Sequence, residues 1–438
     1  MLKSVRTGAA AIAVVVMSAA SPVLAASAPE LHGRAAVLLD GVSGQVLYQE
    51  NATDRNFPAS TTKILTALVA LEHGDLDQVI TVSPDAVDVP PDSSTCWLEA
   101  GEKQTLEYLL YGMLLPSGND CAKAIAEGVS QGNPDQFMVW MNEKAKELGA
   151  TGSQFTNPHG YHDPNHYTTA LDLALIGRAA FTNPTIVRIA GTEEFYWPGK
   201  SEKNGTYHNN NEMLILDPTT IAGKTGYTEE AGRTLVNAAR RGNRLLIGVL
   251  MGEEASGWLY QDMIDLLDYG FSEFTQQELL TPGTYPSSIP VKNGQILEVP
   301  VTPASEFPIS VPKGSTSNVT TRVNAPAELT APVQAGQTVG SIEILEGDRL
   351  LATVPLVAEA TVPVVPLYAK VTQRTLAFSG SLLKWLAVGF GALLVFRTAV
   401  RLVRRAMRRR RGFDTAFRRR RASRTGVISS YRPRSHGH

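Results

Sequence analysis

The stretch Phe57-Pro58-Ala59-Ser60-Thr61-Thr62-Lys63-Ile64-Leu65-Thr66-Ala67-Leu68 places a serine and a lysine three residues apart at the start of an apolar run. A proline precedes the serine, and apolar side chains recur after it at helical spacing, at Ile64, Leu65, Leu68 and Leu71. This pattern predicts that Ser60 lies in the first turn of a buried helix. Lys63 is then expected one turn later on the same face.

This spacing suits an activated nucleophile. A serine hydroxyl is a poor nucleophile at neutral pH and needs a neighbouring base. A lysine can be that base when burial or another cation lowers its pKa, and the helix N-terminus adds free N–H groups that favour developing negative charge. The pattern is weak alone, because an ordinary solvated lysine gives the same spacing and Ser381-Leu382-Leu383-Lys384 repeats it inside an apolar segment.

The second candidate motif is Ser117-Gly118-Asn119, which lies between two predicted helices. Ser-Gly-Asn is also a common turn sequence. In the functional interpretation, Ser117 relays a proton between Lys63 and a leaving group. Asn119 holds a substrate amide, because a carboxamide both donates and accepts hydrogen bonds.

The third candidate motif is Lys224-Thr225-Gly226, which stands just before the last predicted strand pair and is therefore expected on an edge strand. Gly226 has no side chain, so a peptide backbone can lie close against it. Lys224 and Thr225 are suited to hold a terminal carboxylate by charge and hydroxyl. The alternative is a strand or turn with a solvated lysine.

Periodicity divides the body of the chain near Phe274. Residues 30–272 carry strand patterns at both ends around a block of helical patterns, which predicts one sheet assembled from the two ends with helices on it. Strands are expected over 35–39, 45–48, 233–240 and 245–251, and helices over 106–114, 121–129, 137–149 and from 168 onward. Residues 275–366 are rich in Pro, Val and Thr without a helical stripe, which predicts a small β-sandwich that acts as a spacer or binds a partner.

Both ends of the chain carry targeting signals. Residues 1–25 resemble a secretory signal peptide, with Lys3 and Arg6 before an apolar run and small residues at its end. Residues 376–396 are long enough to span about 30 Å of hydrocarbon. The basic tail over 397–438 is expected in the cytoplasm, with the body outside. The alternative is a helix lying on the membrane surface, because Lys384 interrupts the apolar run.

Charge is segregated along the chain. From residue 397 onward there are 15 Arg and one Asp, whereas the rest has 25 Lys and Arg against 41 Asp and Glu. The acidic body argues against nucleic-acid binding. The two cysteines, Cys96 and Cys121, are compatible either with a disulfide in an exported protein or with two small buried side chains. No Cys/His spacing indicates a metal site.

The order Ser-x-x-Lys, Ser-x-Asn, Lys-Thr-Gly, with gaps of about 55 and then 105 residues, is a known catalytic set. On these motifs the chain resembles the serine-type D-alanyl-D-alanine carboxypeptidases, which are low-molecular-mass penicillin-binding proteins. The resemblance extends to the stretches 155–160, 166–174 and 209–214. It implies an α/β catalytic domain of the serine β-lactamase/transpeptidase type, with an antiparallel sheet and helices on both faces. A small all-β sandwich domain and a C-terminal membrane helix are expected to follow.

The resemblance also implies the role of each motif residue. Ser60 is the acylated nucleophile and Lys63 its base, while Ser117 and Asn119 line the facing wall. Substrate contacts are expected from Lys224, Thr225, Gly226 and Tyr227, with the oxyanion held by the backbone N–H groups of Ser60 and Tyr227. Some members place an arginine near Asn210 to bind the carboxylate, where this chain has Asn.

The implied reaction is a two-step acyl transfer that removes the terminal D-alanine from peptidoglycan stem peptides without cofactor or metal, and that β-lactams inhibit. The alternatives are a β-lactamase, a non-catalytic peptidoglycan-binding protein, and an endopeptidase that cuts D-alanine-containing crosslinks. Class A β-lactamases use a glutamate that activates the deacylating water, but residues 157–169 contain Asp163 and no Glu. The presence of all the motif side chains argues against a non-catalytic binding protein.

Overall fold

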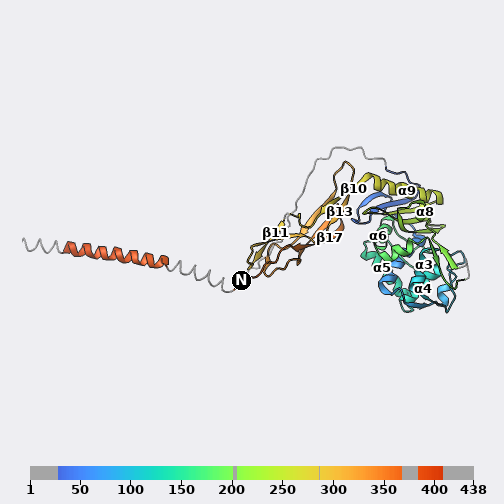
Figure 1. Ribbon diagram of the computed structural model, residues 1–438, viewed down its shortest axis with the longest axis horizontal. Helices are drawn as coiled ribbons and strands as arrows, with labels where there is room; N and C mark the ends of the chain where they lie inside the picture. Colours follow the sequence, from blue (N-terminus) through green and yellow to red (C-terminus); the bar gives the residue numbers. More distant parts are fainter. Residues whose placement is uncertain (1–27, 201–204, 286, 367–382, 408–438) are drawn as a thin grey trace, which may run out of the picture. The chain divides into compact units, whose positions relative to one another are not determined.

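The computed structural model describes residues 28–200, 205–285, 287–366 and 383–407 (Figure 1). The signal sequence expected over 1–25, the first part of the membrane segment expected over 376–396, and the end of the tail lie outside the described residues. The chain divides into two units. The first contains the α/β and all-β parts, and the second contains the C-terminal helix.

The centre of the α/β part is a five-stranded antiparallel sheet whose strands come from both ends of this part of the sequence, as predicted. The strands lie in the order β2 (Val46–Glu50), β1 (Ala35–Asp40), β9 (Arg244–Glu253), β8 (Gly232–Arg241) and β7 (Thr220–Thr228). Strand β7, which contains the third motif, is therefore at the edge of the sheet. Within the described residues no further strand pairs with its outer side, and such an edge can receive an extended peptide.

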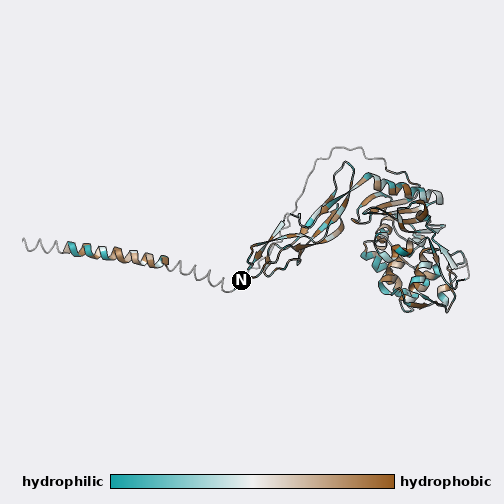
Figure 2. Ribbon diagram, in the orientation of Figure 1, coloured by the Kyte–Doolittle hydropathy of each residue, from teal (hydrophilic) through white to brown (hydrophobic). Residues whose placement is uncertain are grey.

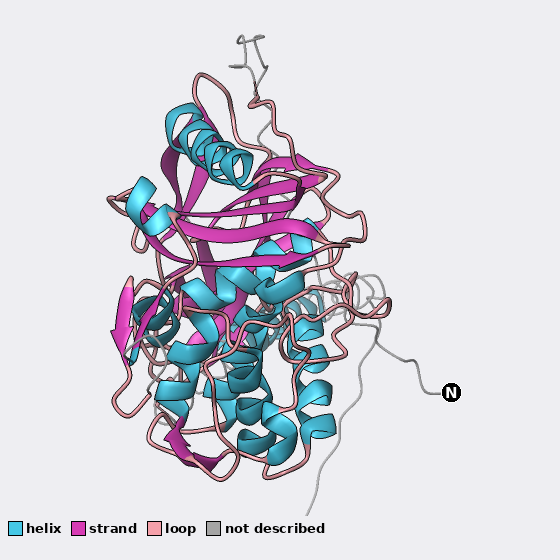
Figure 3. Cartoon of the chain, turned by 90° about the vertical axis from the view of Figure 1, so that its right-hand side faces the viewer, coloured by secondary structure: helices cyan, strands magenta, loops and turns pink. Residues whose placement is uncertain are grey.

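The two faces of the sheet belong to different cores, because successive side chains of a strand point in opposite directions. Val37 and Leu39 of β1 belong to a large core that includes helix α6 (Ala170–Phe181). Leu38 belongs to a second core formed with helix α9 (Ser256–Glu273). Helices consequently cover both sides of the sheet, as Figure 3 shows and as the sequence predicts.

The helical layer begins with a short 3₁₀ turn, η1 (Ala59–Thr62), and six longer helices follow it. These are α1 (Lys63–His73), α3 (Leu106–Leu114), α4 (Asn119–Val129), α5 (Pro134–Glu147), α6 and α7 (Pro184–Ala190). Side-chain caps fix several of their starts: Thr169 caps α6 and Asn133 caps α5, where Pro134 occupies the first turn. Helix α5 therefore starts three residues before the predicted Phe137, and α4 starts at Asn119 rather than residue 121.

Two short helices and two hairpins complete this part of the chain, none of which the sequence patterns indicate. The helices are α2 (Pro84–Val87) and α8 (Met213–Leu216). The hairpins are β3 (Val79–Thr81) with β4 (Lys103–Thr105), and β5 (Glu194–Tyr196) with β6 (Thr206–His208). Each strand has only three residues, too few for a repeating pattern.

From Phe274 to residue 366 the described structure is all β, in agreement with the expected fold class. Strand β10 (Phe274–Leu280) pairs with β13 (Phe307–Pro312). The larger sheet has the order β14 (Val319–Asn324), β16 (Thr338–Glu346), β17 (Arg349–Ala358), β12 (Glu298–Pro303), β11 (Ser287–Lys292) and β15 (Leu329–Thr330). A separate apolar core of Val, Ile and Leu side chains fills this part.

The C-terminal helix spans Leu383–Met407 and is long and apolar enough to cross a membrane. These described residues include part of the segment predicted over 376–396, and the helix continues into residues that we expected in the basic tail. Figure 2 shows that its first part is hydrophobic and its last part hydrophilic. The helix thus joins an apolar stretch to arginines without a break.

Candidate active site

The nucleophile turn, residues 58–63, lies between the helical layer and the edge strand of the sheet. Ser60 lies in the 3₁₀ turn η1, and the α-helix begins only at Lys63, so the serine precedes the helix that the sequence predicts around it. The carbonyl of Pro58 accepts hydrogen bonds from the hydroxyls of Thr61 (2.6 Å) and Thr234 (3.1 Å). The second of these bonds ties the turn to β8.

Lys63 is completely buried, and its ammonium nitrogen has three oxygen neighbours. The Nζ atom lies 2.8 Å from Ser60 Oγ, 2.7 Å from Asn119 Oδ1 and 2.7 Å from the carbonyl oxygen of His159. Burial, followed by the positive charge of Lys224, lowers the pKa of Lys63 well below its ordinary value. The first and second motifs therefore meet at this nitrogen.

The three oxygen neighbours of Lys63 can accept three hydrogen bonds from an ammonium group, and they also fit the neutral amine that a general base must be. A neutral amine has two hydrogens to donate and one lone pair to accept. The oxygens of Asn119 and His159 can only accept, so they take the two N–H groups. The lone pair then points at the Ser60 hydroxyl, which can donate its proton. A general base for serine requires this arrangement, with the two atoms, Lys63 Nζ and Ser60 Oγ, within hydrogen-bond distance.

A glycine permits the close approach beneath the nucleophile turn. Gly160 has φ +81°, and a Cβ atom built on it would lie 1.7 Å from the carbonyl oxygen of Ala59. Both the backbone conformation and the missing side chain therefore require glycine. This contact places the neighbouring His159 carbonyl against Lys63. The sequence did not predict this role of Gly160 and His159.

His166, which lies in the family-like stretch 166–174, has a structural role beside the site. Its Nδ1 accepts a hydrogen bond from the N–H of Thr156 at 3.1 Å, so the proton resides on Nε2, which lies 2.8 Å from Thr62 Oγ1. Burial lowers the pKa of His166 to about 4, which keeps the ring neutral. This histidine orients the turn and contacts neither Ser60 nor Lys63 through a hydrogen bond.

The second motif forms the wall opposite Ser60. Ser117 has φ +73°, unusual for a residue with a side chain, and its buried hydroxyl has no hydrogen-bond partner among the described residues. Both features are unfavourable, and such features concentrate at functional sites. Asn119 is the first residue of α4 and directs its carbonyl oxygen to Lys63. The next residue, Asp120, accepts hydrogen bonds from the backbone N–H groups of Cys96 and Leu98.

The third motif passes directly beside the nucleophile turn. A Cβ atom built on Gly226 would lie 2.9 Å from the backbone nitrogen of Ser60 and 2.4 Å from Thr234 Oγ1. Lys224 is buried and donates to the carbonyl of Thr225 at 3.0 Å, and burial lowers its pKa to about 7. Tyr227 follows with a largely exposed ring.

The structure thus brings the three motifs together around one serine hydroxyl. The contacts that do so are the Lys63–Asn119 hydrogen bond and the close approach of Gly226 to Ser60. Ser117 lies on the same wall without a hydrogen bond to Lys63. The arrangement offers a nucleophile, a buried base and an edge strand for an extended peptide, which are the parts of an acyl-transfer site.

Comparison with known families agrees with this geometry. The D-alanyl-D-alanine carboxypeptidase family matches residues 23–255, more than half of the chain. The chain belongs to the D-alanyl-D-alanine carboxypeptidase family. It is therefore a serine peptidase of the hydrolase class, and its family membership agrees with the resemblance stated above. The C-terminal domain of penicillin-binding protein 5 matches residues 274–364, which form the all-β part.

Individual relatives of this family extend over most of the chain. A D-alanyl-D-alanine carboxypeptidase from Salmonella typhimurium, DacD, is 34% identical over 77% of this chain and 90% of its own length. DacF from Bacillus subtilis is 31% identical over 75% of this chain and 85% of its own. Penicillin-binding protein 5 from Haemophilus influenzae has a similar structure, with a TM-score of 0.64, 29% identity, and coverage of 77% of this chain and 99% of that one.

Proposed function

We propose that this carboxypeptidase removes the terminal D-alanine from peptidoglycan pentapeptides through an acyl-enzyme on Ser60. The observation that supports this most strongly is the position of Lys63 Nζ, buried and 2.8 Å from Ser60 Oγ. In the first step Lys63 accepts the hydroxyl proton while Ser60 attacks the carbonyl between the two D-alanines. In the second step water hydrolyses the acyl-enzyme.

The remaining motif residues receive roles that fit their positions. Ser117, whose hydroxyl is buried and unpartnered among the described residues, passes the proton to the leaving D-alanine. Asn119 contacts the substrate amide while it holds Lys63. The N–H groups of Ser60 and Tyr227 bind the developing oxyanion, which is a contribution worth on the order of 10²–10³ in rate.

Carboxylate binding is assigned to the edge strand. Lys224 offers a buried positive charge and Thr225 a hydroxyl, and Gly226 lets the peptide approach closely. Asn210, where some family members have an arginine nearby, donates its side-chain N–H to the carbonyl of Pro116 at 3.2 Å. The carboxylate affinity therefore depends on Lys224 and Thr225. A β-lactam carries the same carboxylate and acyl group, so we expect penicillins to acylate Ser60.

The proposed organisation follows the sequence divisions: a signal over 1–25, a catalytic domain over 30–272, a β-rich domain over 275–366, a membrane helix over 376–396 and a basic cytoplasmic tail over 397–438. The apolar start and arginine-rich end of the C-terminal helix favour a helix whose tail faces the cytoplasm. The catalytic domain then lies outside, where peptidoglycan is found.

The test is D-alanine release from a pentapeptide ending in D-alanyl-D-alanine, measured with the full chain in detergent beside a Ser60→Ala variant. We expect release from the first and none from the second. If neither protein releases D-alanine while a fluorescent penicillin still labels Ser60, the carboxypeptidase proposal is wrong. A crosslinked substrate would then test for endopeptidase activity.

A further inference from the structure

A cluster of two thiols and one carboxylate lies directly behind the second motif. Cys96 and Cys121 are completely buried and free, and their sulfur atoms and a carboxylate oxygen of Asp120 lie within 4.8 Å of one another. Cys96 belongs to the segment 88–102, which connects α2 to β4, whereas Cys121 is in the first turn of α4. The proposed reaction uses neither thiol.

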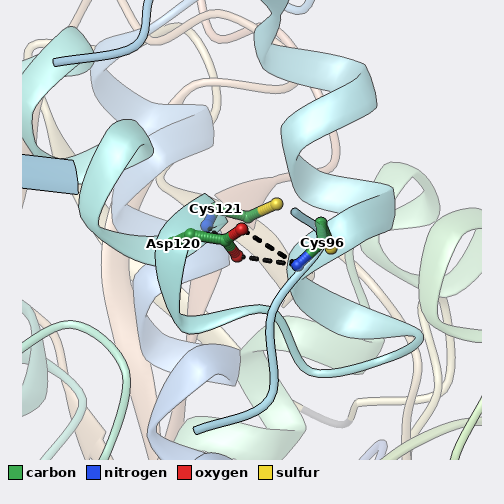
Figure 4. Close-up of side chains that lie close together, drawn as sticks. All are labelled: Cys96, Asp120 and Cys121. Atoms are coloured by element: carbon green, nitrogen blue, oxygen red, sulfur yellow. Dashed lines mark hydrogen bonds between the residues drawn. The ribbon is translucent and has the colours of Figure 1, made fainter. Parts of the chain in front are cut away.

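Both sulfur atoms converge on one small space. A Cβ atom built on Gly112 would lie 2.6 Å from Cys121 Sγ and 2.8 Å from Cys96 Sγ, so the absent side chain leaves room for both thiols. The Cys96 thiol donates to the Gly112 carbonyl at 3.0 Å. Figure 4 shows the Cys121 side chain directed toward the segment that carries Cys96.

Asp120 fixes the distance between the two cysteines. Its carboxylate accepts hydrogen bonds from the backbone N–H groups of Cys96 (2.9 and 3.0 Å), Leu98 (3.0 Å) and Cys121 (2.8 Å). Ser94 adds a third link between the segment and α4, after Cys96 and Leu98, because its carbonyl accepts a hydrogen bond from the N–H of Asn119 at 2.8 Å. The segment 88–102 is thus held on the N-terminus of α4 with the thiols side by side.

We propose that Cys96 and Cys121 form a disulfide, a covalent modification site that links the segment 88–102 to α4 behind the wall of Ser117 and Asn119. The bond requires sulfur atoms at about 2.05 Å, so small side-chain rotations must bring these neighbouring thiols together. Asp120 is an unsuitable metal ligand, because three backbone N–H groups already bind its carboxylate. A metal would therefore find only two sulfur ligands here, fewer than a structural zinc site needs.

The two thiols are oxidised by thiol–disulfide exchange with an oxidant that itself contains a disulfide. One cysteine thiolate attacks a sulfur of the oxidant and releases its first thiol, and the second cysteine then displaces the other thiol to form the Cys96–Cys121 bond. Two electrons and two protons pass to the oxidant in total. Because both thiols are buried in the folded chain, the exchange takes place before the segment 88–102 closes over α4. The finished bond is equally inaccessible to reductant.

The bond stabilises the wall without entering the reaction. It closes a loop of about 25 residues, which predicts an unfolding midpoint roughly 6–12 °C higher for the oxidised protein. The acylation rate of Ser60 is expected to change by less than about threefold, because the Asn119–Ser94 hydrogen bond and those of Asp120 already hold the segment on α4 in the reduced protein.

The experiment counts thiols in the full chain. The protein is purified in detergent from oxidising export and denatured with iodoacetamide present. A parallel sample is reduced in the denaturant before alkylation, and both are measured by intact mass. A second sample is denatured, reduced, and refolded with oxidised and reduced glutathione. We expect no alkylation without reduction, two alkylated cysteines after it, and a midpoint shift that Cys96→Ala and Cys121→Ala both abolish.

Three results would overturn the proposal. The first is two alkylatable thiols in both unreduced samples, which would show that the cysteines stay reduced. The second is a disulfide between two chains, seen as a dimer on a non-reducing gel. The third is a soft metal bound in equal amount to the protein and lost in the Cys96→Ala variant. The thiol count needs no catalytic activity, so it is independent of the proposed function and does not require that any variant fold.

Discussion

Replacing Gly226 by alanine tests whether the edge strand lies against the nucleophile turn as described. The new Cβ atom would lie 2.4 Å from Thr234 Oγ1, 2.9 Å from the nitrogen of Ser60 and 3.0 Å from the carbonyl oxygen of Pro58. An ordinary contact needs at least 3.4 Å, so the turn and β7 must separate by about 0.5 Å at Ser60. Two of the three obstructing atoms are backbone atoms that cannot rotate away.

This separation moves the N–H of Ser60 relative to the N–H of Tyr227, which together form the proposed oxyanion site. Losing one such donor costs on the order of 10²–10³ in rate, and a 1 Å misplacement on the order of 10². We therefore expect the Gly226→Ala variant to be acylated by a fluorescent penicillin roughly 10²-fold more slowly. Overpacking of this kind costs about 1–3 kcal/mol, so the variant should still fold.

The assay is the second-order rate constant of penicillin labelling, with the unfolding midpoint measured on the same samples. Gly257→Ala is the matched control, because a Cβ atom at Gly257 meets no atom within 4 Å. It should label at the wild-type rate. A folded Gly226→Ala protein that also labels at the wild-type rate would refute the close approach of β7 to Ser60.

Four further predictions concern buried charged groups. Lys63→Gln should reduce acylation by about 10²–10⁴-fold, as expected for loss of a general base, and an unchanged labelling rate would contradict that role. Because the pKa of Lys224 is about 7, its positive charge is lost as pH rises, so kcat/KM for a carboxylate-bearing peptide should fall above about pH 7; Lys224→Arg should remove this fall. Asp120→Asn should lower the free energy of unfolding by about 1–3 kcal/mol, measured by urea titration, because an amide group replaces one of the acceptor oxygens. Burial, followed by the charge of Asp262, raises the pKa of Glu253 to about 8. The folded state therefore binds more protons than the unfolded state, and the free energy of unfolding decreases as pH rises from about 4.5 to 8. Glu253→Gln should lessen this decrease, measured by thermal unfolding at pH 5 and 9.

The sequence predicted the parts of the site that local patterns specify. The three motifs have recognisable residues in order, and the position of Lys224-Thr225-Gly226 before the last strand pair indicated an edge strand. The strands expected over 35–39 and 45–48 and those over 233–251 indicated a sheet built from both ends of this part of the chain. Apolar runs bounded by turn residues were sufficient for these predictions, because such runs are typical of strands buried on both faces of a sheet.

The remaining features depend on contacts between distant residues. The carbonyl of His159 contacts Lys63 across 96 positions of sequence, and its role requires the absence of a side chain at Gly160. A backbone carbonyl has no sequence signature. The turn at Ser60 is a 3₁₀ turn that leads directly into α1, a common start of an α-helix that the apolar spacing does not specify. Its hydrogen bond to Thr234 of β8 also lies outside any local pattern.

The central claim is that Ser60 carries the acyl group and that Lys63 activates it. The most direct measurement is to trap the acyl-enzyme with a penicillin, digest the protein and locate the added mass by mass spectrometry. We predict one modified peptide, containing Ser60, which disappears in Ser60→Ala and forms much more slowly in Lys63→Gln. An acyl group on Ser117 or any other residue, or D-alanine release that continues in Ser60→Ala, would contradict the account.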